Sequence, residues 1–203
     1  MRTERSLIYV PVLHSPGDMG TMASSIQRPA EYSAQVAGYW AAVTAEFHSM
    51  RRSWQEFLVY QDGMPDTTAD IVARIVADVD SPNYRLLRWL AGQGAAVTGT
   101  EDPALLQEEY ELLKASVTDE AARQAYAARA AGLRADRDRY IAARIGGTLP
   151  TGGASVLFIG LQHDVARILP PDIAVTSLRC SLRMLPSIAE RLGITQAAAE
   201  GPW

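Results

Sequence analysis

The chain has 203 residues, a formal net charge of −4 at pH 7 and 48% hydrophobic residues. This size and composition are typical of one globular domain. The acidic balance argues against a nucleic-acid partner, and no apolar run approaches the ~18 residues that a membrane-spanning helix requires. The single cysteine, Cys180, allows no internal disulfide and favours a reducing, cytoplasmic location. We interpret it as a buried thiol rather than a nucleophile.

The amino-terminal region predicts a strand, a loop and a long helix. Residues 6–13 (SLIYVPVL) are apolar and rich in β-formers, which favours a buried first strand over a signal peptide. The loop that follows contains Asp18, which we expect to hydrogen-bond within its own loop. From Pro29 a helix is predicted, because apolar and aromatic residues from Tyr32 to Trp54 recur at spacings of three and four. We interpret this stripe as core packing, with the lining of a pocket as the alternative.

The middle of the chain alternates short strands with helices. A strand is predicted at 57–60 (FLVY), a loop at 61–66 (QDGMPD) and a helix at 67–80, with Ile71 among its inward residues. A second helix opens at Pro82 and ends near Gly92 and Gly94. A weak strand follows at 95–98, and Asp102 with Pro103 is typical of a helix start.

The carboxyl-terminal part continues the alternation. Residues 118–146 are rich in alanine and arginine and predict a long helix. Strands are predicted at 155–159 (SVLFI) and 173–176, and a last helix at 181–192. Strands alternating with helices indicate an α/β fold with a mainly parallel open sheet flanked by helices. We expect a single domain over residues 1–196 and a loose tail at 197–203.

Polar residues follow four of the predicted strands. These residues are His14, Asp62, Glu101 and His163. In a parallel sheet the carboxyl ends of the strands lie at one edge, where α/β proteins bind their ligands, so we expect these side chains to meet there. Imidazole and carboxylate groups suit a divalent transition metal such as zinc, manganese or iron, and without a metal they suit acid–base catalysis.

A simpler interpretation is that these polar residues cap helices or satisfy loop amides. Two of the chain's three histidines occupy strand ends, which favours a functional site. The third, His48, falls within the long first helix and is interpreted as structural or solvated. Arg137 and Asp138 would ordinarily be read as part of a solvated helical face.

The segment from Arg137 to His163 resembles the carboxyl-terminal signature of the TraB, ChaN and erythromycin-esterase-like superfamily. In that signature an Arg-Asp helix precedes a strand that ends in Gly-x-x-His, matched here by Arg137-Asp138 and by Gly160 to His163. An amino-terminal strand ending in histidine is the other mark, matched by His14. The turns VYQDG and GTED fit the same layout.

The resemblance implies the α/β fold and a set of activities. Members include hydrolases of esters or peptides and a haem-binding lipoprotein, and metal-dependent members carry two Gly-x-x-His motifs. Here Pro11 replaces the glycine of the first motif. The resemblance also implies that Arg137 and Asp138 point towards the strand ends and support the residues there.

From these features we expect metal-assisted or acid–base hydrolysis of a small molecule. His14, Glu101 and His163 would be the catalytic or metal-binding residues, with Asp62 in support. Two other classes stay open: a small-molecule, metal or haem-binding protein without turnover, and a structural or regulatory protein with a vestigial site. The sequence names no substrate and leaves an oligomer open.

Overall fold

The structure is a computed structural model that describes residues 4–15, 17–18, 31–116 and 119–192. Five strands form one all-parallel sheet, which confirms the α/β fold class. The strands are β1 (Arg5–Val12), β2 (Leu58–Pro65), β3 (Ala96–Glu101), β4 (Ala154–Gly160) and β5 (Ile173–Ser177), in the spatial order β3-β2-β4-β1-β5. The helices are α1 (Tyr32–Ser49), α2 (Ala69–Asp78), α3 (Pro82–Gly92), α4 (Pro103–Ser116), α5 (Glu120–Thr148) and α6 (Arg179–Leu192).

The expected alternation of strands and helices is therefore present. The expected helix start at Pro29 and the expected tail at 197–203 lie outside the described residues. Ile71, expected to point inward, is 37% exposed, because α2 turns Val72 and Val76 towards the core. In the part of the chain that the structure describes, no helix is both long and apolar enough to cross a membrane.

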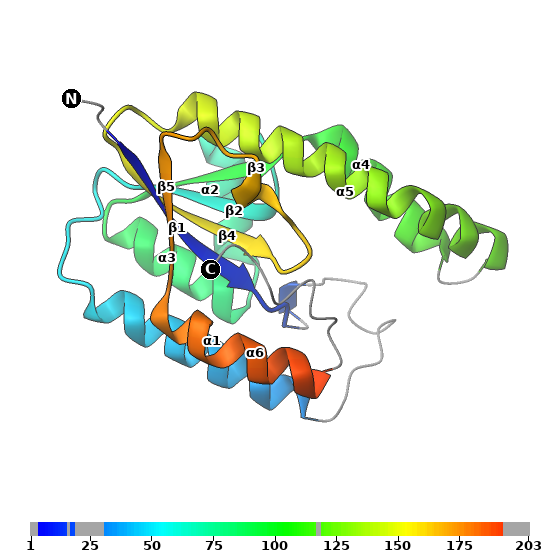
Figure 1. Ribbon diagram of the computed structural model, residues 1–203, viewed down its shortest axis with the longest axis horizontal. Helices are drawn as coiled ribbons and strands as arrows, with labels where there is room; N and C mark the ends of the chain where they lie inside the picture. Colours follow the sequence, from blue (N-terminus) through cyan, green and yellow to red (C-terminus); the bar gives the residue numbers. More distant parts are fainter. Residues whose placement is uncertain (1–3, 16, 19–30, 117–118, 193–203) are drawn as a thin grey trace.

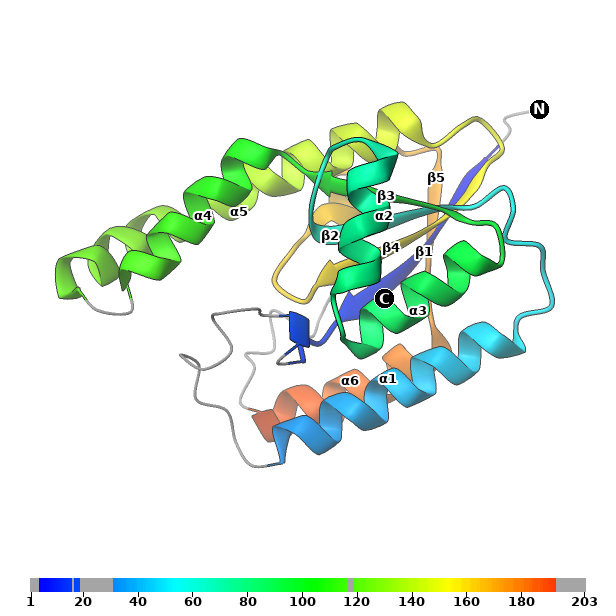
Figure 2. The same ribbon diagram turned by 180° about the vertical axis from the view of Figure 1, so that it is seen from behind.

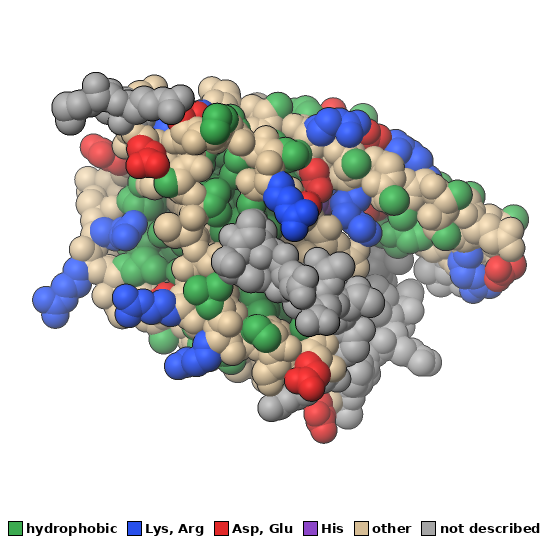
Figure 3. All heavy atoms as spheres, in the orientation of Figure 1, with side chains coloured by type: hydrophobic (Ala, Val, Ile, Leu, Met, Phe, Trp, Pro, Cys, Tyr) green, Lys and Arg blue, Asp and Glu red, His purple; other side chains and the backbone are tan. Residues whose placement is uncertain are grey.

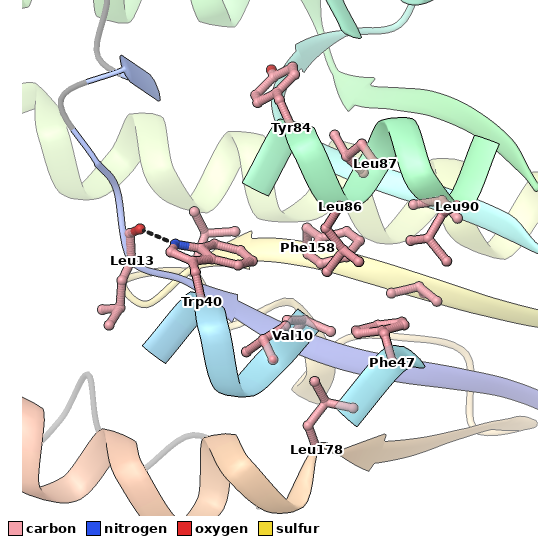
Figure 4. Packing of buried hydrophobic residues seen from close by; sticks show 14 of the residues in the cluster. Val10, Leu13, Trp40, Phe47, Tyr84, Leu86, Leu87, Leu90, Phe158 and Leu178 are labelled. Carbon is pink, nitrogen blue, oxygen red and sulfur yellow. Dashed lines mark hydrogen bonds between the residues drawn. The ribbon is translucent and has the colours of Figure 1, made fainter. Parts of the chain in front are cut away.

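Helices cover both faces of the sheet. One face packs against α1, α2, α3 and α6, and Figure 1 shows α1 and α6 side by side below the sheet, while Figure 2 shows α2 and α3 from the other side. The aromatic stripe of α1 lies in this core, as expected, with Trp40 and Phe47 beside Phe158 of β4 (Figure 4). The opposite face packs against the second half of α5 through Ile141 and Ile145.

The first half of α5 pairs with α4 in a helical hairpin that extends away from the sheet (Figures 1 and 2). With 29 residues, α5 is about 43 Å long at 1.5 Å per residue, which is longer than the sheet beneath it needs. Basic and acidic side chains lie next to each other over this hairpin on the face shown in Figure 3. The root of the hairpin reaches the carboxyl ends of the strands.

Two strands, β2 and β3, extend several residues past their predicted carboxyl ends. The residues predicted as the loop 61–66 continue β2 as far as Pro65, because Gly63 adopts a φ of 69° and the register with β3 shifts there. β3 continues to Glu101, because Gly99 lets the two backbones approach. A Cβ at Gly99 would lie 2.0 Å from the carbonyl oxygen of Pro65. Asp62 and Glu101 are therefore held by strands rather than by loops.

Pro11 is accommodated inside the sheet although it has no N–H group. β5 pairs with β1 only from Arg5 to Tyr9, so no strand lies on that side of β1 at Pro11. The carbonyl oxygen of Pro11 accepts a hydrogen bond from the Tyr39 hydroxyl of α1 at 2.7 Å. The proline therefore fits the end of β1 without breaking a strand pair.

Candidate functional site

His14 lies two residues beyond β1, and α1 fixes the backbone there. The Trp40 indole N–H donates to the carbonyl oxygen of Leu13 at 2.8 Å (Figure 4), and the Tyr32 hydroxyl donates to that of His14 at 2.7 Å. Both donors belong to the aromatic stripe whose main role, as interpreted from the sequence, is core packing. The stripe thus also positions a candidate site residue, and the His14 side chain itself is exposed.

Three of the expected residues meet around Gly160 at the end of β4. Asp62 Oδ2 accepts a hydrogen bond from the Gly160 N–H at 2.8 Å. A Cβ at Gly160 would lie 3.1 Å from Asp62 Oδ2, 3.5 Å from His163 Cδ2 and 3.8 Å from His14 Nε2. The two histidines and Asp62 therefore all lie within 4 Å of one point, on three different strand ends.

His163 is held from behind by Asp138. Its Nδ1 lies 2.5 Å from Asp138 Oδ1, and the other oxygen of Asp138 accepts from the Asp164 N–H at 3.0 Å. This contact turns Nε2 towards Asp62, with 3.7 Å between Nε2 and Asp62 Oδ1. Burial lowers the pKa of His163, but Asp62 and Asp138 outweigh burial and hold the pKa above its ordinary value.

Arg137 joins the carboxylates at the buried end of the site. Its guanidinium forms a two-point contact with Glu101, at 2.6 Å from Nη2 and 3.1 Å from Nε, and Nη2 lies 3.2 Å from Asp62 Oδ1. A third carboxylate, Glu109 of α4, contacts Nη1. Only 6% of Arg137 is exposed, so the guanidinium is the buried counter-ion of this acidic group.

The pKa values of the two inner carboxylates, Glu101 and Asp62, are shifted in opposite directions. Burial raises the pKa of Glu101 to about 7, with Asp62 adding to the effect and Arg137 opposing it. Burial also disfavours the charged form of Asp62, but His163, a hydrogen bond with Glu101 and the charge of Arg137 hold the pKa of Asp62 well below its usual range. Asp62 is therefore the carboxylate that stays ionised, and Glu101 is the one that takes up a proton first.

Glu101 is completely buried, with both oxygens on Arg137. It is placed to hold Arg137, and the structure gives it no exposed surface on which to contact water. Asp62 Oδ1 faces both Arg137 Nη2 and His163 Nε2, and the exposed His14 lies near the same point of β4. Arg137 and Asp138 point to the strand ends and not into solvent, in the orientation that the resemblance implies.

The cluster contains side chains of the types that bind divalent metals. One donor atom each from Asp62, Glu101 and His163 lie within 4.8 Å of one another. Arg137 contacts both Glu101 and Asp62, and His14 Nε2, although close to Gly160, is not among the atoms within 4.8 Å of one another, so the His14 side chain would have to shift to add a second imidazole. Imidazole and carboxylate groups suit zinc, manganese or iron, and metal-binding histidines are commonly held by a carboxylate as Asp138 holds His163. These residues fit such an ion.

Other singled-out residues lie apart from this cluster. Asp18 bonds its own loop, as expected, through the Ser15 N–H at 2.7 Å and the Ser15 hydroxyl at 2.8 Å. His48 is exposed and lies against the Trp89 ring, and Cys180 is buried near α1. Glu109 was missed by sequence reasoning, because nothing in LLQEEYELL distinguishes it from the acidic residues beside it.

Comparisons of the chain with known protein families, with characterised proteins and with solved structures find no match. The case for a function therefore depends on the geometry of the cluster itself.

Proposed function

We propose that the protein is a hydrolase that activates water between His14, Asp62 and His163 at the carboxyl ends of the strands. The observation that carries this proposal is the approach of Asp62 Oδ1 to His163 Nε2, at 3.7 Å, with Asp138 fixing the far side of the imidazole. A fixed imidazole and an ionised carboxylate that lie close together are commonly the groups that remove a proton from water. The substrate is a small molecule, and the compartment we propose is the cytoplasm.

Each residue has a separate task in this proposal. His14 and His163 offer their Nε2 atoms, and Asp62 offers Oδ1, which Arg137 Nη2 also contacts at 3.2 Å. Arg137, together with Glu101, keeps Asp62 in position and ionised. A divalent metal held by the three side chains would lower the pKa of bound water and polarise a carbonyl or phosphoryl oxygen.

A metal-free acid–base mechanism is the second candidate, and one observation favours it. Arg137 already supplies a positive charge to Asp62 and Glu101, so these carboxylates do not depend on a metal for a counter-ion. The raised pKa of His163 also keeps this imidazole protonated closer to neutral pH, as a proton donor to a leaving group requires.

Metal analysis of the purified protein, followed by hydrolysis assays on a panel of chromogenic esters, amides and phosphoesters, tests the proposal. We expect near-stoichiometric zinc, manganese or iron in the wild type and its loss in a His14→Ala/His163→Ala double variant. His48→Ala is the matched control, because this histidine lies away from the cluster. Hydrolysis that survives chelation but not the double substitution supports the metal-free mechanism.

Two outcomes would contradict the hydrolase. If a metal or ligand binds stoichiometrically without turnover of any ester, amide or phosphoester, the protein is a binding protein. If the double variant keeps wild-type hydrolysis, the reaction takes place elsewhere on the molecule.

A further inference from the structure

Among the arginines of α5, Arg134 differs in its partners. Within the described residues, five of the six arginines on this helix contact a carboxylate. The pairs are Arg123 with Glu120, Arg129 with Glu108 and Asp136, Arg137 with Asp62, Glu101 and Glu109, Arg139 with Asp136, and Arg144 with Asp66. Arg134 contacts a neutral amide instead: its Nη2 donates to Gln162 Oε1 at 2.7 Å.

This contact places Arg134 next to the turn that carries His163. Gln162 directly precedes His163 in the turn after β4. Arg134 also lies one helical turn before Asp138, on the same side of α5, and Asp138 is the residue that holds His163. The hydrogen bond to Gln162 therefore joins Arg134 to the turn that carries His163, although α5 and this turn are distant in sequence.

Two carboxylates next to His163, one on α5 and one in the turn after β4, already have other partners. Asp138 accepts from His163 and from the Asp164 N–H, and Asp164 pairs with Arg167 at 3.3 Å. A guanidinium carries five N–H donors in a plane, and the Gln162 oxygen uses only one of them. The half-buried Arg134 thus offers a planar set of donors, next to the turn that carries His163, that the described residues leave without an anion.

We propose that Arg134 binds an anionic oxygen group of the substrate, a carboxylate or a phosphate, at the rim of the site; the proposal rests on the hydrolase function above. Guanidinium and carboxylate or phosphate match in geometry, because two parallel N–H donors meet two oxygens. The inner carboxylates around Arg137 repel an anion, so the charged group stays at the rim. The neutral scissile bond then lies inward, beside His163.

A simpler interpretation is that Arg134 is a solvated arginine on a helix surface. That interpretation predicts that Arg134 and Arg123 behave alike, since both are arginines on α5 with accessible side chains. Arg123 is the matched control, because it pairs with Glu120 near the far end of the hairpin.

Binding of succinate and of inorganic phosphate, measured by calorimetry at constant ionic strength, tests the anion site directly. We expect wild type and Arg123→Gln to bind at least one of these anions equally, and Arg134→Gln to bind it about 10- to 100-fold more weakly, as the loss of charge-assisted hydrogen bonds predicts. Which anion binds identifies the group. No binding by the wild type, or equal binding by Arg134→Gln, overturns the proposal.

Hydrolysis of two matched esters separates this proposal from the hydrolase function. The nitrophenyl half-ester of succinic acid carries a free carboxylate, and its methyl-capped form is neutral. We expect Arg134→Gln to lower kcat/KM for the charged ester about 10- to 100-fold, mainly through KM, and to leave the neutral ester unchanged. If Arg134→Gln hydrolyses both esters with the same ratio of kcat/KM values as the wild type, the role of Arg134 is overturned but the hydrolase function is not. Anion binding that depends on Arg134, without hydrolysis of either ester, supports the anion site and contradicts the hydrolase.

Discussion

Asp62 and Gly160 are 98 residues apart in the sequence, yet the Gly160 N–H donates to Asp62 Oδ2 at 2.8 Å. The contact joins the ends of β2 and β4, two neighbouring strands of the sheet. It leaves Asp62 Oδ1 to face His163 and Arg137. One backbone hydrogen bond therefore decides which oxygen of Asp62 is available to the site.

Gly160→Ala should disturb the site more than the fold. The added methyl group would lie 3.1 Å from Asp62 Oδ2, so the carboxylate must shift by a few tenths of an ångström. We expect a loss of about 1–2 kcal/mol in the free energy of unfolding, as in mild overpacking, and weaker metal or anion binding. Chemical denaturation and calorimetry measure the two effects.

Gly38→Ala is the control for that experiment. Gly38 lies within α1, and a Cβ there meets nothing within 4 Å. Alanine should therefore stabilise the protein by about 0.5–1 kcal/mol, because it favours the helix more than glycine does. If both substitutions have the same effect, the close approach at Gly160 has no consequence.

Arg137→Met should strongly destabilise the protein, because it leaves Asp62, Glu101 and Glu109 without their shared counter-ion. Removing one partner of a buried ion pair costs about 3–5 kcal/mol. Arg123→Met, which removes an exposed ion pair, should change stability by under about 1 kcal/mol. Adding Glu101→Gln to Arg137→Met should restore at least about 1 kcal/mol, because it removes one buried charge. Additive effects in this double-mutant cycle would show that Glu101 and Arg137 are not coupled.

Trp40→Phe should loosen the backbone that carries His14. The substitution keeps an aromatic ring in the core but removes the indole N–H that donates to Leu13. We expect a cost of about 1–3 kcal/mol, from the unsatisfied carbonyl and the lost volume, together with weaker metal binding. Trp89→Phe is the control, since Trp89 packs against Trp54 and His48 away from the cluster. Equal metal binding by the two variants would show that α1 does not position His14.

Cys180 should react slowly with thiol reagents in the folded protein. Burial, followed by the Glu46 carboxylate, raises the pKa of this thiol to about 12. At pH 8 the thiolate fraction is then about 1,000-fold smaller than that of a free cysteine, and it increases as pH rises towards 12. A disulfide reagent, followed by absorbance, should modify the unfolded chain about 1,000-fold faster than the native one. Rapid modification of the native protein at pH 8 would contradict the buried placement.

The residue types and their periodicity were sufficient to predict the alternation of strands and helices. SLIYVPVL and SVLFI are short, apolar and β-branched, and a parallel sheet covered on both faces requires such strands. The placement of polar residues after them was predictable for the same reason, because parallel strands end at one edge. The prediction of a loop at 61–66 was wrong. It was made because these residues are typical of turns, whereas the close approach of Gly99 to Pro65, which accompanies the continued strand, is visible only in the structure.

What the sequence determined by itself is the fold class and the four strand-end residues His14, Asp62, Glu101 and His163. Only the tertiary structure decided how they divide, with Glu101 buried on Arg137 and the other three around Gly160. The rotation of α5 about its own axis determines this division, because the alanine- and arginine-rich sequence of the helix does not specify which arginine points inward. Packing of Ile141 and Ile145 against the sheet fixes that rotation, and it turns Arg137 to the carboxylates and Asp138 to His163.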